Sequence, residues 1–306
     1  MAVGSFLRTQ RDVGSGVNAM CDRALLKDFP PGEGVRVGAF QEHFDEEGWI
    51  PISVPGDVHR TLLDAGRIED PFYDRNAEKC AWIEAREWWY RMSFDGPQEP
   101  LQPDERLRLV FHGLDTFATI YLNSEELGRH HNMFREAVFD VGDLVRPGEN
   151  TLALLFDRPL DHVGEELPDQ WGRNPERVYM RKAQFGSGWD WGPRLPTVGI
   201  WRPIELRREL RASIKGVHFY TLDIDPIRRR AAVAIRVEVE RFAADSPLEA
   251  AVTLTAPDGP LVAESSLVLD GEDSNVTVYL TVDNPRLWWT HDLGQPVLYG
   301  LRVELC

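Results

Sequence analysis

Hydrophobic and polar residues alternate with a period of two along a series of short segments that begins at Trp88. β-Branched and aromatic residues are common in these segments, which is typical of strands. Turn-forming pairs such as Gly96-Pro97, Asn123-Ser124 and Pro147-Gly148 separate them. Several short strands with frequent turns and little helix predict a sandwich or a jelly roll. The predicted strands are Trp88–Phe94, Arg106–His112, Phe117–Asn123, Ala137–Val141 and Asn150–Phe156.

A second series of strand-like segments follows Leu210. Residues 233–240 and 276–282 alternate between aliphatic side chains and others, and Ala256–Gly259 has the composition of a hairpin turn. The last predicted strand is Val297–Leu305. Together these segments predict a sandwich of immunoglobulin size, ~95 residues long. We therefore expect an all-β chain of two domains, residues 1–208 and residues 209–306.

Three stretches depart from the period of two. Residues 1–35 are rich in glycine and are expected to be mostly irregular. Residues 57–65 predict a short helix that Asp57 caps and Gly66 ends. Between Phe156 and a predicted strand at Trp201–Arg207 lie about forty residues without a sustained period. Aromatic residues are frequent there, so we expect an ordered, functional loop rather than disorder. They are Trp171, Tyr179, Phe185, Trp189 and Trp191.

Composition and charge exclude several classes of function. Acidic residues outnumber basic ones by 50 to 34, which gives a net charge of −16. Such a surface repels phosphate backbones and anionic lipid, so we expect neither a nucleic-acid nor a membrane partner. Cys21, Cys80 and Cys306 are widely spaced and form no metal-binding motif, so no disulfide framework, metal site or cofactor is expected. The first thirty residues lack the apolar core of a signal peptide, which predicts a cytoplasmic protein.

The segment Trp189-Asp190-Trp191 carries the most informative chemistry. Sugars present apolar C–H faces and hydroxyl groups, and sites that bind them combine flat aromatic faces with a few carboxylates and amides. A carboxylate between two indoles can accept hydrogen bonds from two hydroxyls. The alternative is structural: both tryptophans fill the core, and Asp190 pairs with Arg181, Arg194 or Arg202.

Longer motifs resemble the N-terminal region of the β-mannosidases of glycoside hydrolase family 2. Arg181–Gln184 and Gly188–Pro203 resemble the sugar-binding domain of that family. The resemblance runs from about residue 40 to the end of the sequence, and the second half is similar to the family's immunoglobulin-like domain. The other matching segments are Trp49–Pro51, Val54–His59, Leu62–Phe72, Trp88–Arg91, Phe111–Thr116, Tyr121–Asn123, Asn132–Phe134, Gly148–Asn150, Pro285–Trp289 and Gln295–Tyr299.

The resemblance implies a jelly-roll, galactose-binding-like sandwich, then an immunoglobulin-like sandwich, then a catalytic TIM barrel. The barrel of such enzymes carries two glutamates that perform retaining hydrolysis. A barrel takes about 250 residues, and this sequence ends where the barrel is expected to begin. The sequence leaves open whether the second sandwich includes its last strand. We therefore expect a non-catalytic portion, from a truncated chain or a shortened gene, that contributes part of the sugar pocket but holds no catalytic residue.

The resemblance also assigns candidate residues. In the family, the loop that matches Trp189-Asp190 reaches the barrel mouth, and its Asp binds hydroxyls of the terminal sugar. This implies exo cleavage of terminal β-D-mannose residues from the non-reducing end. Asn132 lies where related members place an Asn near the same sugar. Trp191 is expected to pack under the loop, and Gly192-Pro193 to fix its turn. Without a barrel, an exposed apolar docking face implies self-association.

Two other functions stay open. An exo-β-glucosaminidase of the same family shares a Trp-Asp-Trp signature, although the continuation Gly192–Pro196 favours a mannosidase. A stand-alone carbohydrate-binding or adhesion module would carry no enzyme at all. The coding region downstream of Cys306 discriminates them, because a continuing frame with a barrel supports the enzyme and a true stop supports the module.

Overall fold

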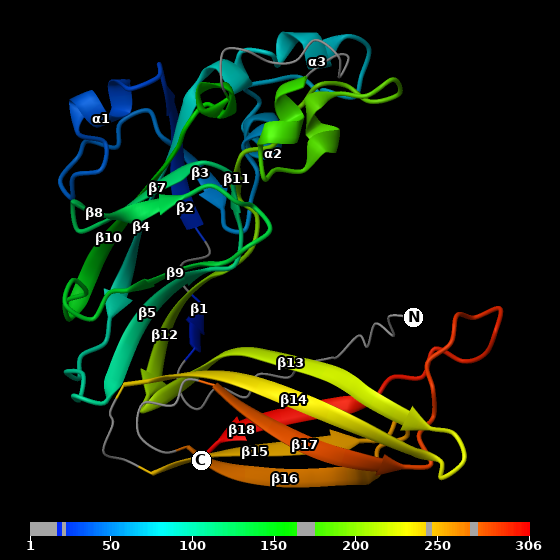
Figure 1. Ribbon diagram of the computed structural model, residues 1–306. Coiled ribbons are helices and arrows are strands. Elements are labelled where there is room, and N and C mark those ends of the chain that lie inside the picture. The colour runs from blue at the N-terminus through cyan, green and yellow to red at the C-terminus, as the bar shows by residue number, and fades with distance from the viewer. Residues whose placement is uncertain (1–16, 20–22, 164–174, 243–246, 270–274) are drawn as a thin grey trace. The chain divides into compact units, whose positions relative to one another are not determined.

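The computed structural model describes residues 17–19, 23–163, 175–242, 247–269 and 275–306. The described residues are mostly strands, with short helices between some of them (Figure 1). They divide into two compact units. The first unit extends to Leu101 and resumes over Leu107–Arg208, and the second comprises Gln102–Arg106 and Glu209–Cys306. The prediction of an all-β chain is confirmed.

The first unit is a jelly-roll-like sandwich of antiparallel strands. In the described part of the chain, a six-stranded sheet runs in the order β3 (Ile50–Ser53), β2 (Arg23–Phe29), β4 (Glu87–Gly96), β10 (Gly148–Phe156), β7 (Ala118–Leu122) and β8 (Glu125–His130). A four-stranded sheet has the order β1 (Val17–Ala19), β12 (Ile204–Leu210), β5 (Glu105–Phe111) and β9 (Ala137–Asp140). A short sheet pairs β11 (Gly199–Ile200) with β6 (Leu114–Asp115).

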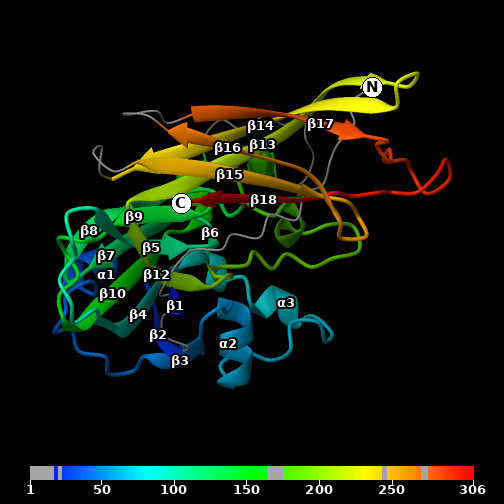
Figure 2. The ribbon, with the colours of Figure 1, turned by 90° about the horizontal axis from the view of Figure 1, so that it is seen from below.

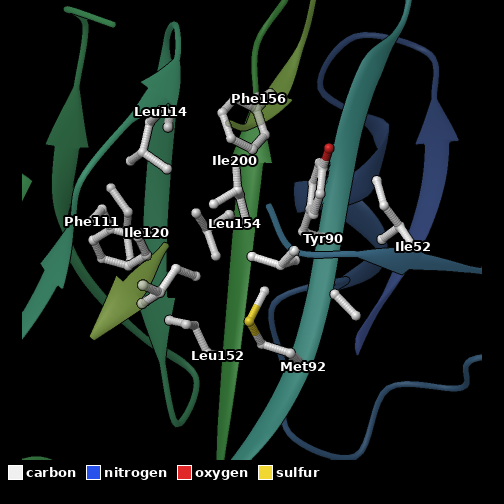
Figure 3. Close-up of a cluster of buried hydrophobic side chains, with 14 of the residues drawn as sticks. Ile52, Tyr90, Met92, Phe111, Leu114, Ile120, Leu152, Leu154, Phe156 and Ile200 are labelled. Carbon is white, nitrogen blue, oxygen red and sulfur yellow. The ribbon is translucent and has the colours of Figure 1, made fainter. Parts of the chain in front are cut away.

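The alternation of β4 and β10 explains the core of this unit. Tyr90 and Met92 of β4 and Leu154 of β10 point into one buried cluster, to which Phe111 of β5 also belongs (Figure 3). Each large apolar side chain that is fully buried stabilises the fold by ~1.5–3 kcal/mol. The intervening residue Trp89 is buried on the opposite face of the sheet. Both faces of the central strands are therefore covered.

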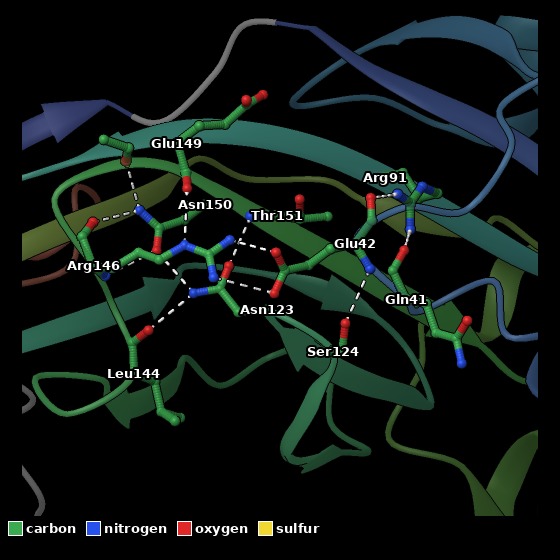
Figure 4. A network of polar contacts seen from close by, with 11 residues as sticks. Gln41, Glu42, Arg91, Asn123, Ser124, Leu144, Arg146, Glu149, Asn150 and Thr151 are labelled. Atoms are coloured by element: carbon green, nitrogen blue, oxygen red, sulfur yellow. Dashed lines mark hydrogen bonds and ion pairs between the residues drawn. The ribbon is translucent and has the colours of Figure 1, made fainter.

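Residues 39–49 cover that opposite face, and Arg91 of β4 holds them in place. Its guanidinium donates hydrogen bonds to the carbonyls of Gln41 and Glu42 (Figure 4). It also donates to the carbonyl of Ala39 and forms an ion pair of 3.0 Å with Glu46. The side chain of Arg91 is only 2% exposed. A buried cation needs such partners because it has lost its hydration.

A second polar network fixes the turns beside β10. The amide nitrogen of Asn123 donates to the carbonyl of Leu144 and to Oδ1 of Asn150, both at 2.9 Å (Figure 4). Asn123 has a positive φ of 50°, which asparagine tolerates better than most residues. The predicted turn at Asn123-Ser124 is therefore present, and Arg146 links it to residues 39–49 through an ion pair with Glu42.

The short helices lie in the connections of the first unit. The predicted helix at 57–65 is confirmed as α2 (Val58–Asp64), where the Asp57 side chain accepts a hydrogen bond from the backbone N–H of Arg60. The α-helices α1 (Glu33–Val37) and α3 (Asn76–Lys79) and the 3₁₀ helices η1 (Ile83–Ala85), η2 (Pro159–His162), η4 (Pro175–Tyr179) and η5 (Gln184–Ser187) complete the set. No helix among the described residues is long and apolar enough to cross a bilayer.

The expectation that residues 1–35 are mostly irregular is wrong for the segment that becomes β2. This strand hydrogen-bonds to β3 on one side and to β4 on the other. Ala24 and Leu26 alternate into the core, with 3% and 1% of their surface exposed. The segment is too short for its alternation to stand out among the surrounding glycines, and its two neighbouring strands supply the pairing.

The second unit is an immunoglobulin-like sandwich. Among its described residues, one sheet has the order β13 (Ala212–Asp225), β14 (Arg230–Arg241) and β17 (Asn275–Asp283). The other has the order β16 (Leu261–Leu269), β15 (Leu248–Thr255) and β18 (Gly300–Leu305). Alternate residues of β14, β15 and β17 form one core, as the period of two predicted. The predicted hairpin is also confirmed, since the N–H of Gly259 donates to the carbonyl of Ala256 at 2.9 Å.

Candidate functional site

The Trp189–Gly192 segment forms a tight two-residue turn. The backbone N–H groups of Trp189 and Gly192 each donate to the other's carbonyl, at 3.0 and 3.2 Å. Asp190 and Trp191 therefore occupy the tip, where both are exposed. Gly188 precedes the turn with a φ of +93°, a conformation that favours glycine. The loop thus presents a carboxylate and two indoles to solvent.

The expectation that Trp191 packs under the loop is wrong. Its side chain is 82% exposed, more than the 47% of Trp189. A residue at the tip of a two-residue turn points away from the chain that the turn connects, so little protein surface covers it. The two indole rings contact each other with centroids 5.6 Å apart. The guanidinium of Arg177 lies over the Trp189 ring at 4.6 Å. Neither tryptophan fills the core.

The structural alternative for Asp190 also fails among the described residues, where no ion pair joins its carboxylate to an arginine. Arg194 instead donates hydrogen bonds to two glutamates. Its Nε lies 2.9 Å from Oε1 of Glu84 in η1, and its Nη1 lies 2.7 Å from Oε1 of Glu176 in η4. Arg194 also donates to the carbonyl of Ser187 at 3.2 Å. Its role is to fix the base of the loop.

A buried ion pair anchors the two ends of the loop. Nζ of Lys182 lies 2.5 Å from Oδ1 of Asp115 in β6, and both side chains are almost fully buried. Lys182 also donates to the carbonyl of Thr197, whose hydroxyl donates to Oδ2 of Asp115 at 2.6 Å. Burial lowers the pKa of Lys182, and the charge of Asp115 opposes that shift. No local sequence pattern indicates this pair, because its two residues lie 67 positions apart.

Asp57 connects the end of the loop to α2. Besides capping that helix, its carboxylate accepts a hydrogen bond of 3.2 Å from the backbone N–H of Val198. The neighbouring His59 is buried, and its Nδ1 lies 3.7 Å from Asp57. Burial lowers the pKa of His59, while the charges of Asp57 and Glu84 raise it. Asp57, His59, Glu84 and Lys182 thus form a polar layer beside the base of the loop.

Asn132 lies on the segment between β8 and β9 and is brought beside Arg181. The N–H of Met133 donates to the carbonyl of Arg181 at 3.0 Å. The side-chain oxygen of Asn132 accepts a hydrogen bond of 3.0 Å from the N–H of Phe134. In the described part of the chain, no hydrogen bond joins Asn132 to Asp190. Trp171, a further aromatic residue of the predicted loop, lies outside the described residues.

Comparison with known families assigns the two units. Residues 39–202 match the glycosyl hydrolase 2 galactose-binding domain-like family, and residues 212–306 match glycosyl hydrolases family 2. The chain therefore belongs to glycosyl hydrolase family 2, as its motifs indicated.

Its relatives include enzymes named for mannosidase activity. The chain is 33% identical over 265 residues to β-mannosidase B of Thermothelomyces thermophilus, a match that covers 84% of this chain and 30% of the relative. The crystal structure of β-D-mannosidase from Dictyoglomus thermophilum matches 95% of this chain and 34% of that one, with a TM-score of 0.80 and 29% identity. An exo-chitosanase from Amycolatopsis orientalis, with a TM-score of 0.62 and 18% identity over 94% of this chain and 33% of that one, shares the fold. This chain spans about a third of the length of the curated relatives it matches.

Proposed function

We propose that this chain is the N-terminal, non-catalytic portion of an exo-acting, retaining β-mannosidase, which removes terminal β-D-mannose residues from non-reducing ends. Its contribution is one wall of the sugar pocket, formed by the Trp189–Gly192 turn. The names of the similar enzymes support the substrate class. The exposed tip that carries Asp190 supports the role in binding.

The single observation that carries this proposal is the state of Asp190. Its carboxylate is at the surface, while nearby Arg194 is committed to Glu84 and Glu176. A carboxylate that no cation neutralises keeps its oxygens available for sugar hydroxyls, and hydrogen bonds to a charged group are worth ~1.5–3 kcal/mol. Trp189 offers an apolar face beside it. In the proposed site Asn132 uses its amide nitrogen, because its oxygen already accepts from Phe134.

In the proposed enzyme, the catalytic carboxyl groups lie outside residues 1–306. Retaining hydrolysis needs two carboxyl groups on either side of the glycosidic bond, and the loop supplies Asp190 at most. Purified residues 1–306 are therefore expected to release no product from an aryl β-mannoside above a blank without protein. Turnover above that blank would contradict the proposed division of labour.

The decisive experiment uses Asp190→Ala in a protein that also contains the catalytic barrel. We expect kcat/KM for an aryl β-mannoside to fall by roughly ten- to a hundredfold, because the lost hydrogen bonds act on the bound sugar. The thermal midpoint should stay unchanged, since no buried group is removed. Asp143→Ala, which removes an exposed carboxylate from a turn of the same unit, is the matched control. A loss of stability without a kinetic loss would make Asp190 a structural residue.

Exposed aromatic side chains extend beyond the loop tip. Phe72, Tyr73 and Phe185 are exposed in the first unit together with Trp191. Large exposed apolar surfaces mark sites of association. We infer that they contact further protein in the whole enzyme, and that the isolated chain self-associates through them.

A further inference from the structure

A pocket of about 260 Å³ lies in the first unit and is not lined by any residue of the Trp189–Gly192 turn. Its walls come from β2, β3, β4 and α2 and from the connecting segments at Gly48, Arg67 and Trp82. Figure 2 shows β2, β3 and α2 grouped together on this side of the unit. Segments up to 62 residues apart in sequence thus enclose one hollow, from Leu26 to Trp88.

Part of the pocket lining is apolar. Trp88 and Leu62 are buried there, and the indole N–H of Trp88 donates to the carbonyl of Ile83 at 3.0 Å. Trp82, by contrast, keeps 40% of its surface exposed, and its ring lies 5.9 Å from that of Trp88. An aromatic face that borders a hollow is suited to the C–H face of a flat, ring-shaped ligand.

The rim of the pocket is cationic in a chain of net charge −16. Arg67 and Lys27 both line it. Among the described residues no hydrogen bond or ion pair engages the guanidinium of Arg67, and Nζ of Lys27 donates to the carbonyl of Glu47 at 2.9 Å. The third charged group, Asp28, is already neutralised by Arg86 at 2.6 Å.

Two of the three carboxylates nearest to Arg67 in sequence are also neutralised, and the third, Asp70, accepts a hydrogen bond from the backbone N–H of Phe72. Asp64 pairs with Arg60 at 2.9 Å, and Glu69 pairs with Lys79 at 2.5 Å. Lys27, whose ammonium also lies over the ring of Phe29 at 5.6 Å, is engaged elsewhere. Arg67 is therefore the charged group of the pocket lining that keeps no partner among the described residues, and its positive charge favours an anion. A guanidinium binds the planar edge of a carboxylate or phosphate with two parallel hydrogen bonds.

We infer that this pocket is a second ligand site, which binds a single sugar-sized ring that carries one anionic group, a carboxylate or a phosphate. Its volume lies below the ~300–1,000 Å³ of pockets for drug-sized ligands, so one ring fits and a longer oligosaccharide does not. Trp82 contacts the ring face, and Arg67 binds the anion. The site is independent of the proposed role of Asp190.

The test is a binding measurement on purified residues 1–306 by ligand-observed NMR with glucuronate, glucose 6-phosphate and neutral glucose. At least one of the two anions should bind at concentrations up to about 10 mM, and at least tenfold more tightly than glucose. The tighter of the two identifies the anionic group. Absence of binding by both, or equal binding of glucose, overturns the inference.

Variants locate the binding at this pocket. Arg67→Gln should weaken anion binding by at least tenfold with an unchanged thermal midpoint, and Trp82→Ala should weaken it as well. Arg129→Gln, which removes an exposed guanidinium of β8 that pairs with Glu126, is the matched control and should bind as the parent protein does. Asp190→Ala should also bind normally, which separates this site from the mannoside site. If Arg67→Gln folds and binds like the parent protein, the anion lies elsewhere and the inference is wrong.

Discussion

Two connecting segments of the first unit, residues 39–49 and residues 182–197, are both held by buried or half-buried cations. They differ in whether their aromatic side chains are buried or exposed. In the first, Phe44 and Trp49 pack over the guanidinium of Arg91, at 5.8 and 5.9 Å. In the second, Lys182 and Arg194 hold the base, yet Trp189 and Trp191 stay exposed at the tip. The cations explain why both segments are ordered. Only in the first segment do these tryptophan and phenylalanine side chains contribute to the packing of the fold.

This difference supports a binding role for the second segment. The exposed indoles add little to the stability of this fold, because an aromatic side chain stabilises a protein mainly when it is buried from water. A segment that is anchored at its base and apolar at its tip is organised to contact something else. The following predictions test whether this separation between stability and function is real.

The largest expected effect is a difference in stability between loss of a buried tryptophan and loss of an exposed one. Trp49→Ala should lower the free energy of unfolding by ~3–5 kcal/mol, because it leaves a cavity beside Arg91. Trp191→Ala should change it by no more than about 0.5 kcal/mol, because its side chain is almost fully solvated. Denaturant unfolding of both variants measures the difference. A Trp191→Ala variant as unstable as Trp49→Ala would mean that the tip is part of the core.

The strands were largely predictable, since β14 alternates clearly and β4 and β10, although buried on both faces over much of their length, are rich in aromatic and aliphatic residues. Strand β13 escaped prediction for a physical reason. Its pairing with β14 contains register shifts between Ile214 and Gly216 and between Thr221 and Asp223, and each bulge resets the alternation on which the pattern depends.

The site was predictable only in part. Composition and resemblance pointed to Trp189 and Asp190, which the structure presents at the surface. Which way Trp191 faces depends on the turn geometry, and composition does not encode it. The Lys182–Asp115 pair joins residues 67 apart in sequence. Their contact follows from the pairing of β6 with β11 and the path of the loop, which no local pattern reveals.

A smaller effect is expected at the anchor of the loop. Lys182→Met should cost about 3 kcal/mol of stability, because it leaves the buried carboxylate of Asp115 without a cation. Lys215→Met is the control. Its ion pair with Glu240 is exposed, and such pairs are worth less than about 1 kcal/mol. Adding Asp115→Asn to Lys182→Met should recover part of the loss, and urea unfolding of the four proteins measures it. No recovery would show that packing of the lysine stem matters more than its charge.

The smallest expected effect is a pH dependence from His59, which lies in the polar layer beside the loop. Burial lowers its pKa below the ordinary 6.5, as the charge of Lys182 also does, although Asp57 and Glu84 act in the opposite direction. As the pH falls below 6.5, the unfolded chain therefore binds a proton that the folded chain does not. The free energy of unfolding should fall as the pH is lowered, by at most about 1.4 kcal/mol per pH unit, until the folded pKa is reached.

His59→Gln should flatten this part of the stability profile between pH 7 and pH 5. Burial lowers the pKa of His130 too, so His130→Gln should remove a separate share, and the double variant the sum of both. Thermal midpoints across this pH range measure the three slopes. If the slope survives the loss of His59, the proton is taken up elsewhere and the polar layer beside the loop is insensitive to acid. The loop would then keep its anchored base under acidic conditions.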